Sequence, residues 1–306
     1  MCRVKLYGYF LVLLILQPLQ FYDLTGQDPL KKFFFSDNEQ KSVTIPFRFI
    51  NNLIVIPISI NSSDTLNFIL DTGVNTTILS ELNWQDSLSL VFAKQIELQG
   101  LGQGKPVEAL HSFGNNISIS DITGKNQDIY VLLESSFNLS AKMGISVNGI
   151  IGFPVFQSFI VEINYPDKII TFYKREAFNN KKKGRGYTTL PITINDTKPY
   201  LTIRVADDAG NIHTVKLLID TGASHAIWLD ENTLEGISKP ETQKYSFLGA
   251  GLNGMVFGET MRFQFVDIYG FKLMDPIISF PDSVSLAYAS GIDLRNGSMG
   301  SDILRR

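Results

Sequence analysis

Cysteine and histidine are scarce in this sequence, and both scarcities exclude kinds of site. The chain of 306 residues has one cysteine, Cys2, which lies before an apolar segment near the N-terminus. Cys2 therefore predicts neither a disulfide nor thiol chemistry in the mature chain. The three histidines, His111, His213 and His225, do not follow the spacing of metal ligands. We expect no metal and no cofactor.

The sequence also lacks a large charge of either sign and a long apolar run. Its formal net charge is −3, which does not indicate a nucleic-acid partner. The apolar run at residues 6–16 is short for a membrane span, and Arg3 and Lys5 precede it. This arrangement is typical of an export signal, so residues 1–26 are expected to be a cleaved signal peptide. An uncleaved anchor is the alternative, and it is the only membrane association that we expect.

The residues that are plentiful indicate a mostly β protein. Hydrophobic residues make up 44% of the chain, and short runs of Phe, Ile, Val and Thr alternate with Asn, Gly, Asp and Pro. Residues 27–42 are expected to be an N-terminal extension, which could be a pro-segment. The basic run at 181–186 contains two glycines and could bind phosphate, but such runs are more often solvated linkers. We interpret residues 179–186 as a linker.

An internal repeat is the most informative pattern in the chain. Three pairs of segments recur in the same order, centred on Asp71 and Asp220, on Gly102 and Gly251, and on Gly152 and Gly300. The separations of these pairs are 149, 149 and 148 positions. Similar segments in one order with a nearly constant offset predict two similar lobes, at 43–178 and 187–306. Such lobes can pack about a pseudo-two-fold axis, as identical subunits do about a true one.

Each copy of the repeat contains the sequence Asp-Thr-Gly directly after an apolar strand. Asp71 follows residues 68–70, and Asp220 follows residues 217–219. A buried carboxylate is costly unless something satisfies or uses it. The pseudo-symmetry would place Asp71 and Asp220 face to face, where two carboxylates about 3 Å apart share one proton.

With these doubled motifs the sequence resembles the aspartic proteases. Val74 and Ala223 after the motif glycines, and the short segment 98–102, resemble the retropepsin-like branch. Two copies in one chain are similar to the pepsin-like enzymes. The overall resemblance is to exported bacterial aspartyl proteases, which often carry a PDZ domain. It implies an all-β fold of two retropepsin-like β-barrel lobes, related by a pseudo-two-fold axis, with the active-site cleft between them.

The resemblance also implies an activity and a site. The activity is that of an aspartic-type endopeptidase, a hydrolase that activates a water between two aspartates. The implied site consists of the catalytic Asp71 and Asp220, the supporting Thr72, Gly73, Thr221 and Gly222, and the flap residues Gly100, Leu101, Gly102, Gly249, Ala250 and Gly251. The two flaps span residues 98–104 and 248–254. The threonines are expected to cross-link the acid loops, and the motif glycines to let backbone approach the carboxylates.

Plainer interpretations compete with each of these features. Asp-Thr-Gly can be an ordinary turn, the two threonines can cap turns, and the glycine-rich hairpins can be simple β-turns. His225 follows the second motif, but Thr76 stands at its place in the first lobe, so we expect a surface or pocket-rim histidine. The alternative function is a catalytically inactive peptide-binding module on the same fold.

The remaining expectations concern the substrate, the oligomeric state, the location and the length of the chain. The substrate is expected to be an extended peptide or unfolded protein, and the protein a monomer. The expected signal peptide implies export, to the periplasm, the envelope or the medium. A bacterial protein is favoured over a eukaryotic one, because a glycan at the sequon of Asn75 would block the cleft and the mature chain has no disulfide. Residues 159–174 predict a hairpin that has no counterpart after Leu304, so the sequence as given is expected to lack a strand of the second lobe.

Overall fold

A computed structural model describes residues 31–81, 88–133, 137–178, 188–233, 236–237, 244–289 and 295–306. The expected signal peptide at 1–26 and the expected linker at 179–186 lie outside these residues. Among the residues described, no helix combines the length and the apolar character needed to cross a membrane.

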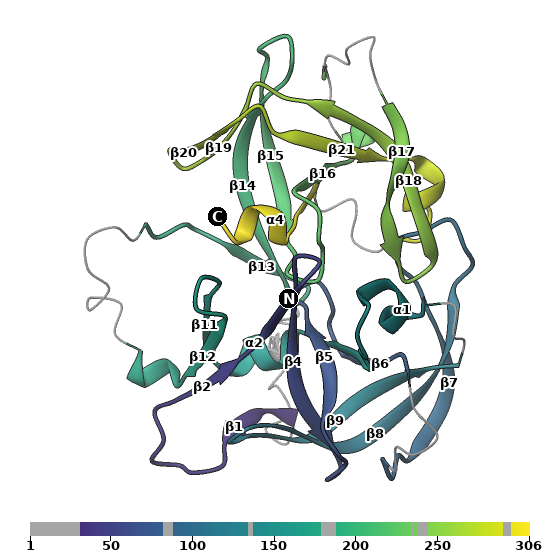
Figure 1. The fold of residues 1–306 in the computed structure, drawn as a ribbon, viewed down its shortest axis with the longest axis vertical. Helices are drawn as coiled ribbons and strands as arrows, with labels where there is room; N and C mark the ends of the chain where they lie inside the picture. Colours follow the sequence, from purple (N-terminus) through teal and green to yellow (C-terminus); the bar gives the residue numbers. More distant parts are fainter. Residues whose placement is uncertain are drawn as a thin grey trace, which may run out of the picture.

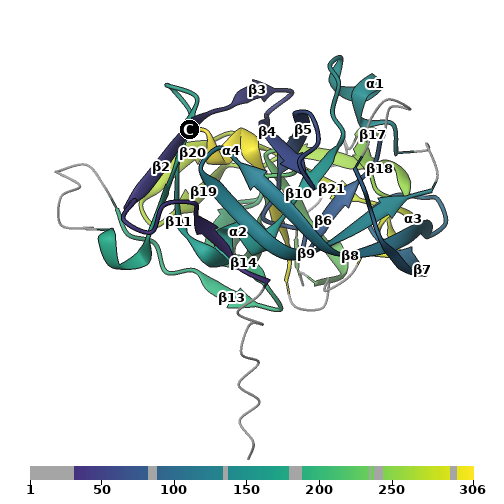
Figure 2. The ribbon, with the colours of Figure 1, turned by 90° about the horizontal axis from the view of Figure 1, so that it is seen from below.

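The first lobe is built on a nine-stranded sheet (Figure 1). Its strands are β1 (Phe33–Phe35), β3 (Arg48–Ile50), β4 (Leu53–Ile60), β5 (Leu66–Leu70), β6 (Thr77–Leu79), β7 (Phe92–Leu98), β8 (Val107–Ile119), β9 (Ile122–Leu132) and β10 (Gly149–Ile151). The long strand β8 pairs with β4 on one side and with β9 on the other, which closes six of the strands into a barrel. Figure 2 shows β8 and β9 running side by side.

Residues 33–35, which lie within the expected extension at 27–42, belong to this lobe. In β1, Phe33 and Phe35 are buried while Phe34 is exposed, and the strand pairs with β9. Residues 33–35 therefore complete the first-lobe sheet rather than precede it.

A separate three-stranded sheet lies beside the barrel. It consists of β2 (Ser42–Pro46), β12 (Ile169–Tyr173) and β11 (Ile160–Asn164), with β12 in the middle. The strands β11 and β12 form the hairpin that the sequence predicts at 159–174. Short helices complete the first half: α1 (Leu139–Met143), α2 (Phe153–Ser158) and the 3₁₀ turn η3 (Arg175–Ala177).

The second lobe is built on a ten-stranded sheet. Its strands are β13 (Thr193–Asn195), β14 (Lys198–Ala206), β15 (Ile212–Ile219), β16 (Ile227–Leu229), β17 (Lys244–Gly251), β18 (Gly254–Arg262), β19 (Phe265–Ile268), β20 (Phe271–Met274), β21 (Ile277–Pro281) and β22 (Gly297–Met299). The short helical segments of this half are η5 (Glu231–Thr233), α3 (Ser283–Leu286) and α4 (Ser301–Leu304).

The strand pairings repeat between the lobes, as the sequence repeat predicts. In the first lobe β10 lies between β5, to which it is parallel, and β6, to which it is antiparallel. In the second lobe β22 lies between β15 and β16 in the same two senses. The predicted all-β fold of two similar lobes is therefore confirmed, and Figure 1 shows the second lobe above the first.

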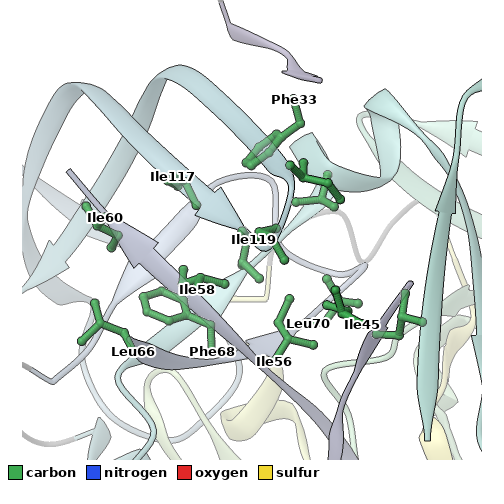
Figure 3. Close-up of a cluster of buried hydrophobic side chains, with 14 of the residues drawn as sticks. Phe33, Ile45, Ile56, Ile58, Ile60, Leu66, Phe68, Leu70, Ile117 and Ile119 are labelled. Atoms are coloured by element: carbon green, nitrogen blue, oxygen red, sulfur yellow. The ribbon is translucent and has the colours of Figure 1, made fainter. Parts of the chain in front are cut away.

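Each lobe has a hydrophobic core of its own. The first-lobe core gathers side chains from the barrel and from β1 and β2, among them Phe68, Ile56 and Ile117 (Figure 3). The second-lobe core contains Leu217, Ile227 and other apolar residues of β14 to β22. A second cluster of the first lobe, which contains Val55, Ile69 and Ile150, packs against Leu252 of the second lobe. The acid loops meet at the seam between the lobes.

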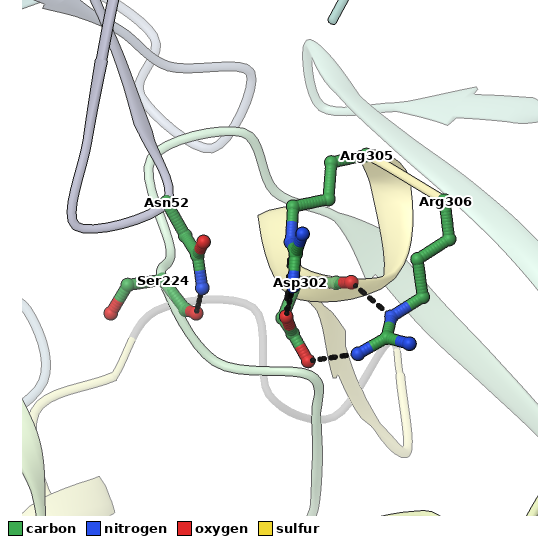
Figure 4. A network of polar contacts seen from close by, with 5 residues as sticks. All are labelled: Asn52, Ser224, Asp302, Arg305 and Arg306. Atoms are coloured by element: carbon green, nitrogen blue, oxygen red, sulfur yellow. Dashed lines mark hydrogen bonds and ion pairs between the residues drawn. The ribbon is translucent and has the colours of Figure 1, made fainter. Parts of the chain in front are cut away.

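Polar contacts also connect the lobes away from the acids. The Nδ2 of Asn52, in the turn between β3 and β4, donates to the carbonyl of Ser224 at 3.2 Å (Figure 4). Nearby, Asp302 of α4 forms ion pairs with Arg305 and Arg306.

Candidate active site

The two motif aspartates lie at equivalent places, each at the end of a buried strand. Asp71 follows β5, and its N–H donates to the carbonyl of Ile151 at 2.9 Å. Asp220 follows β15, and its N–H donates to the carbonyl of Met299 at 3.0 Å. The strands β10 and β22 therefore position the two acids in the same way.

The carboxyl groups of Asp71 and Asp220 meet at the seam. A methyl group placed on Gly73 would lie 3.1 Å from Oδ1 of Asp71 and 3.2 Å from Oδ1 of Asp220. A methyl group placed on Gly222 would lie 2.1 Å from Cγ of Asp71, so no larger residue fits there. The absence of side chains lets each glycine N–H donate to its own aspartate, at 2.6 Å for Gly73 and 3.0 Å for Gly222.

The two threonines bind the opposite lobe. The Thr72 hydroxyl donates to the carbonyl of Ile219 at 2.6 Å, and the Thr221 hydroxyl donates to the carbonyl of Leu70 at 2.8 Å. Each hydroxyl also accepts the N–H of the other threonine at 3.1 Å. These four bonds cross the seam in a symmetric pattern, whereas a threonine that capped its own turn would bond within one lobe.

Burial and mutual repulsion set the protonation of the pair. Burial raises the pKa of Asp71 well above its ordinary value, and the neighbouring charge of Asp220 raises it further. Burial also raises the pKa of Asp220, but the positive charge of Arg295 opposes this effect. Because both pKa values are raised and the two groups interact, the pair titrates as a unit and holds one proton between its two carboxyl groups.

A cavity of about 450 Å³ lies over the two acids. Both aspartates and both motif glycines line it. On the first-lobe side the apolar residues Ile78, Phe137 and Ile150 line it. The polar residues Asn75, Thr76 and Gln99 also line it on this side. On the second-lobe side the walls are formed by Lys198, Leu218, His225, Trp228, Ala289 and Arg295.

The two glycine-rich hairpins cover this cavity and touch each other. The first is the turn between β7 and β8, and the second is the turn between β17 and β18. The N–H of Asn253 donates to the carbonyl of Leu101 at 2.9 Å, and the N–H of Gly104 donates to the carbonyl of Asn253 at 2.6 Å. The side chain of Asn253 donates to the carbonyl of Lys105 at 2.5 Å. The tips thus interlock above the acids.

The predicted flap residues divide into two groups. Gly100, Leu101, Gly249, Ala250 and Gly251 line the cavity. Gly102 instead packs against the other hairpin, where a methyl group would lie 2.5 Å from the backbone carbon of Asn253. Its φ of +127° is a second reason why glycine stands there.

Comparison with known proteins agrees with this geometry. Residues 56–155 match the family model of aspartyl proteases. Among solved structures, an aspartic proteinase from Irpex lacteus aligns with a TM-score of 0.51 and 12% identity, over 87% of this chain and 92% of that chain. The chain has the aspartic protease fold. The resemblance to aspartic proteases of the retropepsin or pepsin type is therefore confirmed. No curated protein sequence matches significantly.

Within the aspartic protease fold, His225 takes a structural position at the cavity wall. Its ring stacks on Trp228 at a centroid distance of 4.2 Å, and its Nε2 lies 2.9 Å from the hydroxyl of Ser298. Burial lowers the pKa of His225 to about 3, so the ring is neutral at ordinary pH. A neutral, stacked histidine of this kind supports the wall of the cavity.

Sequence reasoning missed the charged residues of the second-lobe wall. Lys198 and Arg295 lie outside the recognised motifs, at the start of β14 and just before β22. The internal repeat could have drawn attention to them, because the corresponding residues of the first lobe are apolar. Asn253 was also missed, although it stands in the second glycine-rich segment, because only the contact between the hairpins shows its role.

Proposed function

We propose that this protein is an aspartic endopeptidase whose catalytic residues are Asp71 and Asp220. One observation carries the proposal: two carboxyl groups of opposite lobes are buried side by side, and backbone N–H groups and cross-linking threonines fix their positions. A pure binding module has no need to bury two acids together, because doing so is costly.

The protonation of the pair suits peptide hydrolysis. The ionised acid of the pair takes a proton from a water held between the acids, while the protonated acid gives its proton to the carbonyl oxygen of the substrate. The water oxygen bonds to the carbonyl carbon and gives a tetrahedral diol. The acid that took the proton of the water then gives it to the amide nitrogen, and the other acid takes a proton from a hydroxyl of the diol. The carbon–nitrogen bond breaks to release a carboxylic acid and an amine, and both acids are back at their starting charges.

The cavity and the interlocked hairpins support an extended peptide as substrate. The strands of β17 and β18 end at the cavity, so their backbone can pair with an extended chain while side chains occupy the walls. Because the hairpins touch above the acids, they must separate to admit a peptide and then close over it. Closure of this kind separates the reacting water and the substrate from the bulk solvent.

The proposal is tested by proteolysis of unfolded casein between pH 4 and pH 7. The Asp71→Asn and Asp220→Asn variants are each expected to lose at least about 100-fold in rate, because general acid–base catalysis needs both groups. Asp275→Asn is the matched control, since Asp275 is exposed and pairs with Arg262. We expect this control to keep its activity.

The alternative function, an inactive peptide-binding module, predicts a different result. A binder would retain peptides at any pH in this range without cleaving them, and neither active-site substitution would change the products. Equal rates for the wild type and both active-site variants would therefore exclude the endopeptidase.

A further inference from the structure

We propose that Asp282 is a positioning residue for the reaction, because through Gln103 it holds the first hairpin closed against the second lobe. The inference rests on the proposed function. The Nε2 of Gln103 donates to Oδ2 of Asp282 at 3.0 Å, and we call this contact the latch. Neither residue is among those that line the cavity. The latch therefore acts on the reaction through the position of the hairpin and not through contact with the substrate there.

The second lobe holds Asp282 in a fixed position. The N–H of Asp282 donates to the carbonyl of Phe257 in β18 at 2.9 Å. Its Oδ1 accepts the N–H of Ser285 at 2.7 Å and so caps α3, and the hydroxyl of the buried Ser285 accepts the N–H of Phe257 at 3.0 Å. The Tyr245 hydroxyl of β17 donates to Oδ2 at 2.7 Å. A carboxylate that β17, β18 and α3 hold in this way can orient a hairpin of the other lobe.

The backbone of the first hairpin binds at the same place. The N–H of Gly102 donates to the carbonyl of Ser285 at 2.9 Å, and the N–H of Gln103 donates to the carbonyl of Met255 at 3.0 Å. With the latch, two consecutive residues of one lobe thus make three bonds to the other lobe. The latch is the charge-assisted bond of the three, and bonds of this kind are stronger than neutral ones.

The internal repeat shows that the latch is specific to the first hairpin. At the offset of 149 positions that relates the two lobes, Leu252 stands in the second hairpin where Gln103 stands in the first. Leu252 packs against an apolar cluster of the first lobe, which includes Val107. The second hairpin thus docks on the first lobe by an apolar contact, and the first hairpin docks on the second lobe by a carboxylate. A change of charge at position 103 or 282 therefore tests the latch and leaves the apolar contact as it is.

Asp282 accepts the latch as a carboxylate. Partial burial raises its pKa, but the hydrogen bonds from Ser285, Tyr245 and Gln103 outweigh this effect and leave the pKa of Asp282 below its ordinary value. Asp282 is therefore ionised at neutral pH. Its three hydrogen-bond donors carry no charge, so a second carboxylate at position 103 would meet Asp282 without a cation among these contacts.

The first test measures the closed position directly, without substrate. Gln103→Glu replaces the donor of the latch by a second carboxylate. We expect hydrogen exchange at 99–106 to be about tenfold faster than in the wild type at pH 7, because an attraction has become a repulsion. Two facing carboxylates come to share a proton as the pH falls. The ratio of the exchange rates of variant and wild type should therefore move toward one near pH 4.

A compensating substitution and a control connect this effect to Asp282. Adding Asp282→Asn to Gln103→Glu exchanges the donor and the acceptor of the latch, and asparagine caps a helix about as well as aspartate. The double variant should therefore return exchange at 99–106 close to the rate of the wild type. Gln264→Glu is the matched control, because Gln264 is exposed, donates to the carbonyl of Asp208 at 3.0 Å and lies outside the cavity lining. It should leave this exchange unchanged.

The second test asks whether the latch serves the reaction. Rates are measured at pH 7 on a peptide that the wild type cleaves in casein. Gln103→Glu is expected to lower kcat about tenfold without raising KM, because a smaller fraction of the bound enzyme is closed. The double variant should recover most of kcat. A residue that bound the substrate itself would raise KM when it is changed, so this pattern identifies a positioning role.

The outcomes separate this inference from the proposed function. Exchange in Gln103→Glu that equals the wild type, or that Asp282→Asn does not restore, would show that Asp282 does not hold the hairpin. If the wild type cleaves the peptide and kcat is unchanged in Gln103→Glu, the positioning role is wrong and the endopeptidase stands. If the wild type cleaves nothing, the endopeptidase is wrong, and the exchange rates still decide whether Asp282 holds the hairpin closed.

Discussion

At the scale of single residues, the site depends on groups that would be unfavourable elsewhere. Asp71 is only 8% exposed, yet it is an acid beside another acid. The glycine N–H groups and the shared proton reduce the cost of burying this pair. Both the two carboxyl groups and the two threonines that bond across the seam are therefore expected to affect the stability of the fold.

The first prediction concerns the stability of Asp71→Asn as pH changes. An acid whose pKa is raised by folding stabilises the folded state fully below its ordinary value of 3.8, and this contribution is lost as the pH rises through the folded pKa. Asparagine does not ionise. The free energy of unfolding of the wild type, relative to Asp71→Asn, should therefore fall between pH 4 and pH 7.

Urea denaturation at several pH values measures this difference. Asp275→Asn, which removes an exposed carboxyl, is the matched control. A wild type that gains stability relative to Asp71→Asn as the pH rises would contradict the assignment of a raised pKa to the pair.

The second prediction concerns the hydroxyl of Thr221. Valine has nearly the same shape but cannot bond the carbonyl of Leu70 or the N–H of Thr72, and both groups lie in the buried seam. We expect Thr221→Val to lower the free energy of unfolding by about 2–4 kcal/mol, because a buried polar group without a partner costs about 1–3 kcal/mol.

Thr221→Ser is the control for this substitution, since serine keeps the hydroxyl. It should recover most of the lost stability in the same denaturation experiment. Equal losses for valine and serine would contradict this prediction, because keeping the hydroxyl would then have recovered no stability.

At the scale of elements, the two hairpins form one cover. The turn between β7 and β8 and the turn between β17 and β18 are held by backbone bonds between Leu101, Gly104 and Asn253. The N–H of Gly102 also donates to the carbonyl of Ser285 next to the second hairpin, at 2.9 Å. Opening the cover must break several such bonds at once, so the open state is expected to be the minor one.

The third prediction is that Gly102→Ala keeps the hairpins apart. The new methyl group would lie 2.5 Å from the backbone of Asn253, and the φ of +127° is unfavourable for alanine. We expect faster hydrogen exchange at 99–106 and 251–254 and a loss of at least about tenfold in kcat/KM, because misplaced covering elements reduce catalysis.

Gly270→Ala is a matched control for backbone strain. Gly270 has a φ of +98° but faces open space in the turn between β19 and β20. The Gly270→Ala variant should lose stability through backbone strain alone, and hydrogen exchange at the two hairpins should not change. If both substitutions changed exchange equally, the contact with Asn253 would not be what holds the cover closed.

At the scale of the whole molecule, the site exists only where the two lobes meet. Neither lobe contains both acids, and each threonine needs a carbonyl of the other lobe. A ligand that spans the seam contacts both lobes and should therefore stabilise the whole described fold.

The fourth prediction uses pepstatin, which imitates a peptide at its point of cleavage. At a concentration about 100 times its Kd, a bound ligand adds about 2.7 kcal/mol to the free energy of unfolding. We expect a single shifted transition in scanning calorimetry. The Asp220→Asn variant should show a smaller shift, whereas stabilisation of only one of two separate transitions would contradict binding across the seam.

The sequence by itself determined the repeat, the strand-ending acids and the all-β class. These features follow from local order: Asp71 and Asp220 stand at the same place in two copies of one pattern, and alternation of apolar residues specifies strands. The hairpin at 159–174 was predictable for the same reason, since its strands and turn are adjacent in the chain.

Only the tertiary structure decided which residues complete the site. Lys198 and Arg295 lie nearly a hundred positions apart and reach one wall because β14 and β22 both pair with β15. Asn253 holds the first hairpin from the other lobe. Residues 33–35 join the first barrel through β9. Contacts across a seam depend on how two sheets are packed, and a local pattern in the sequence carries no record of that packing.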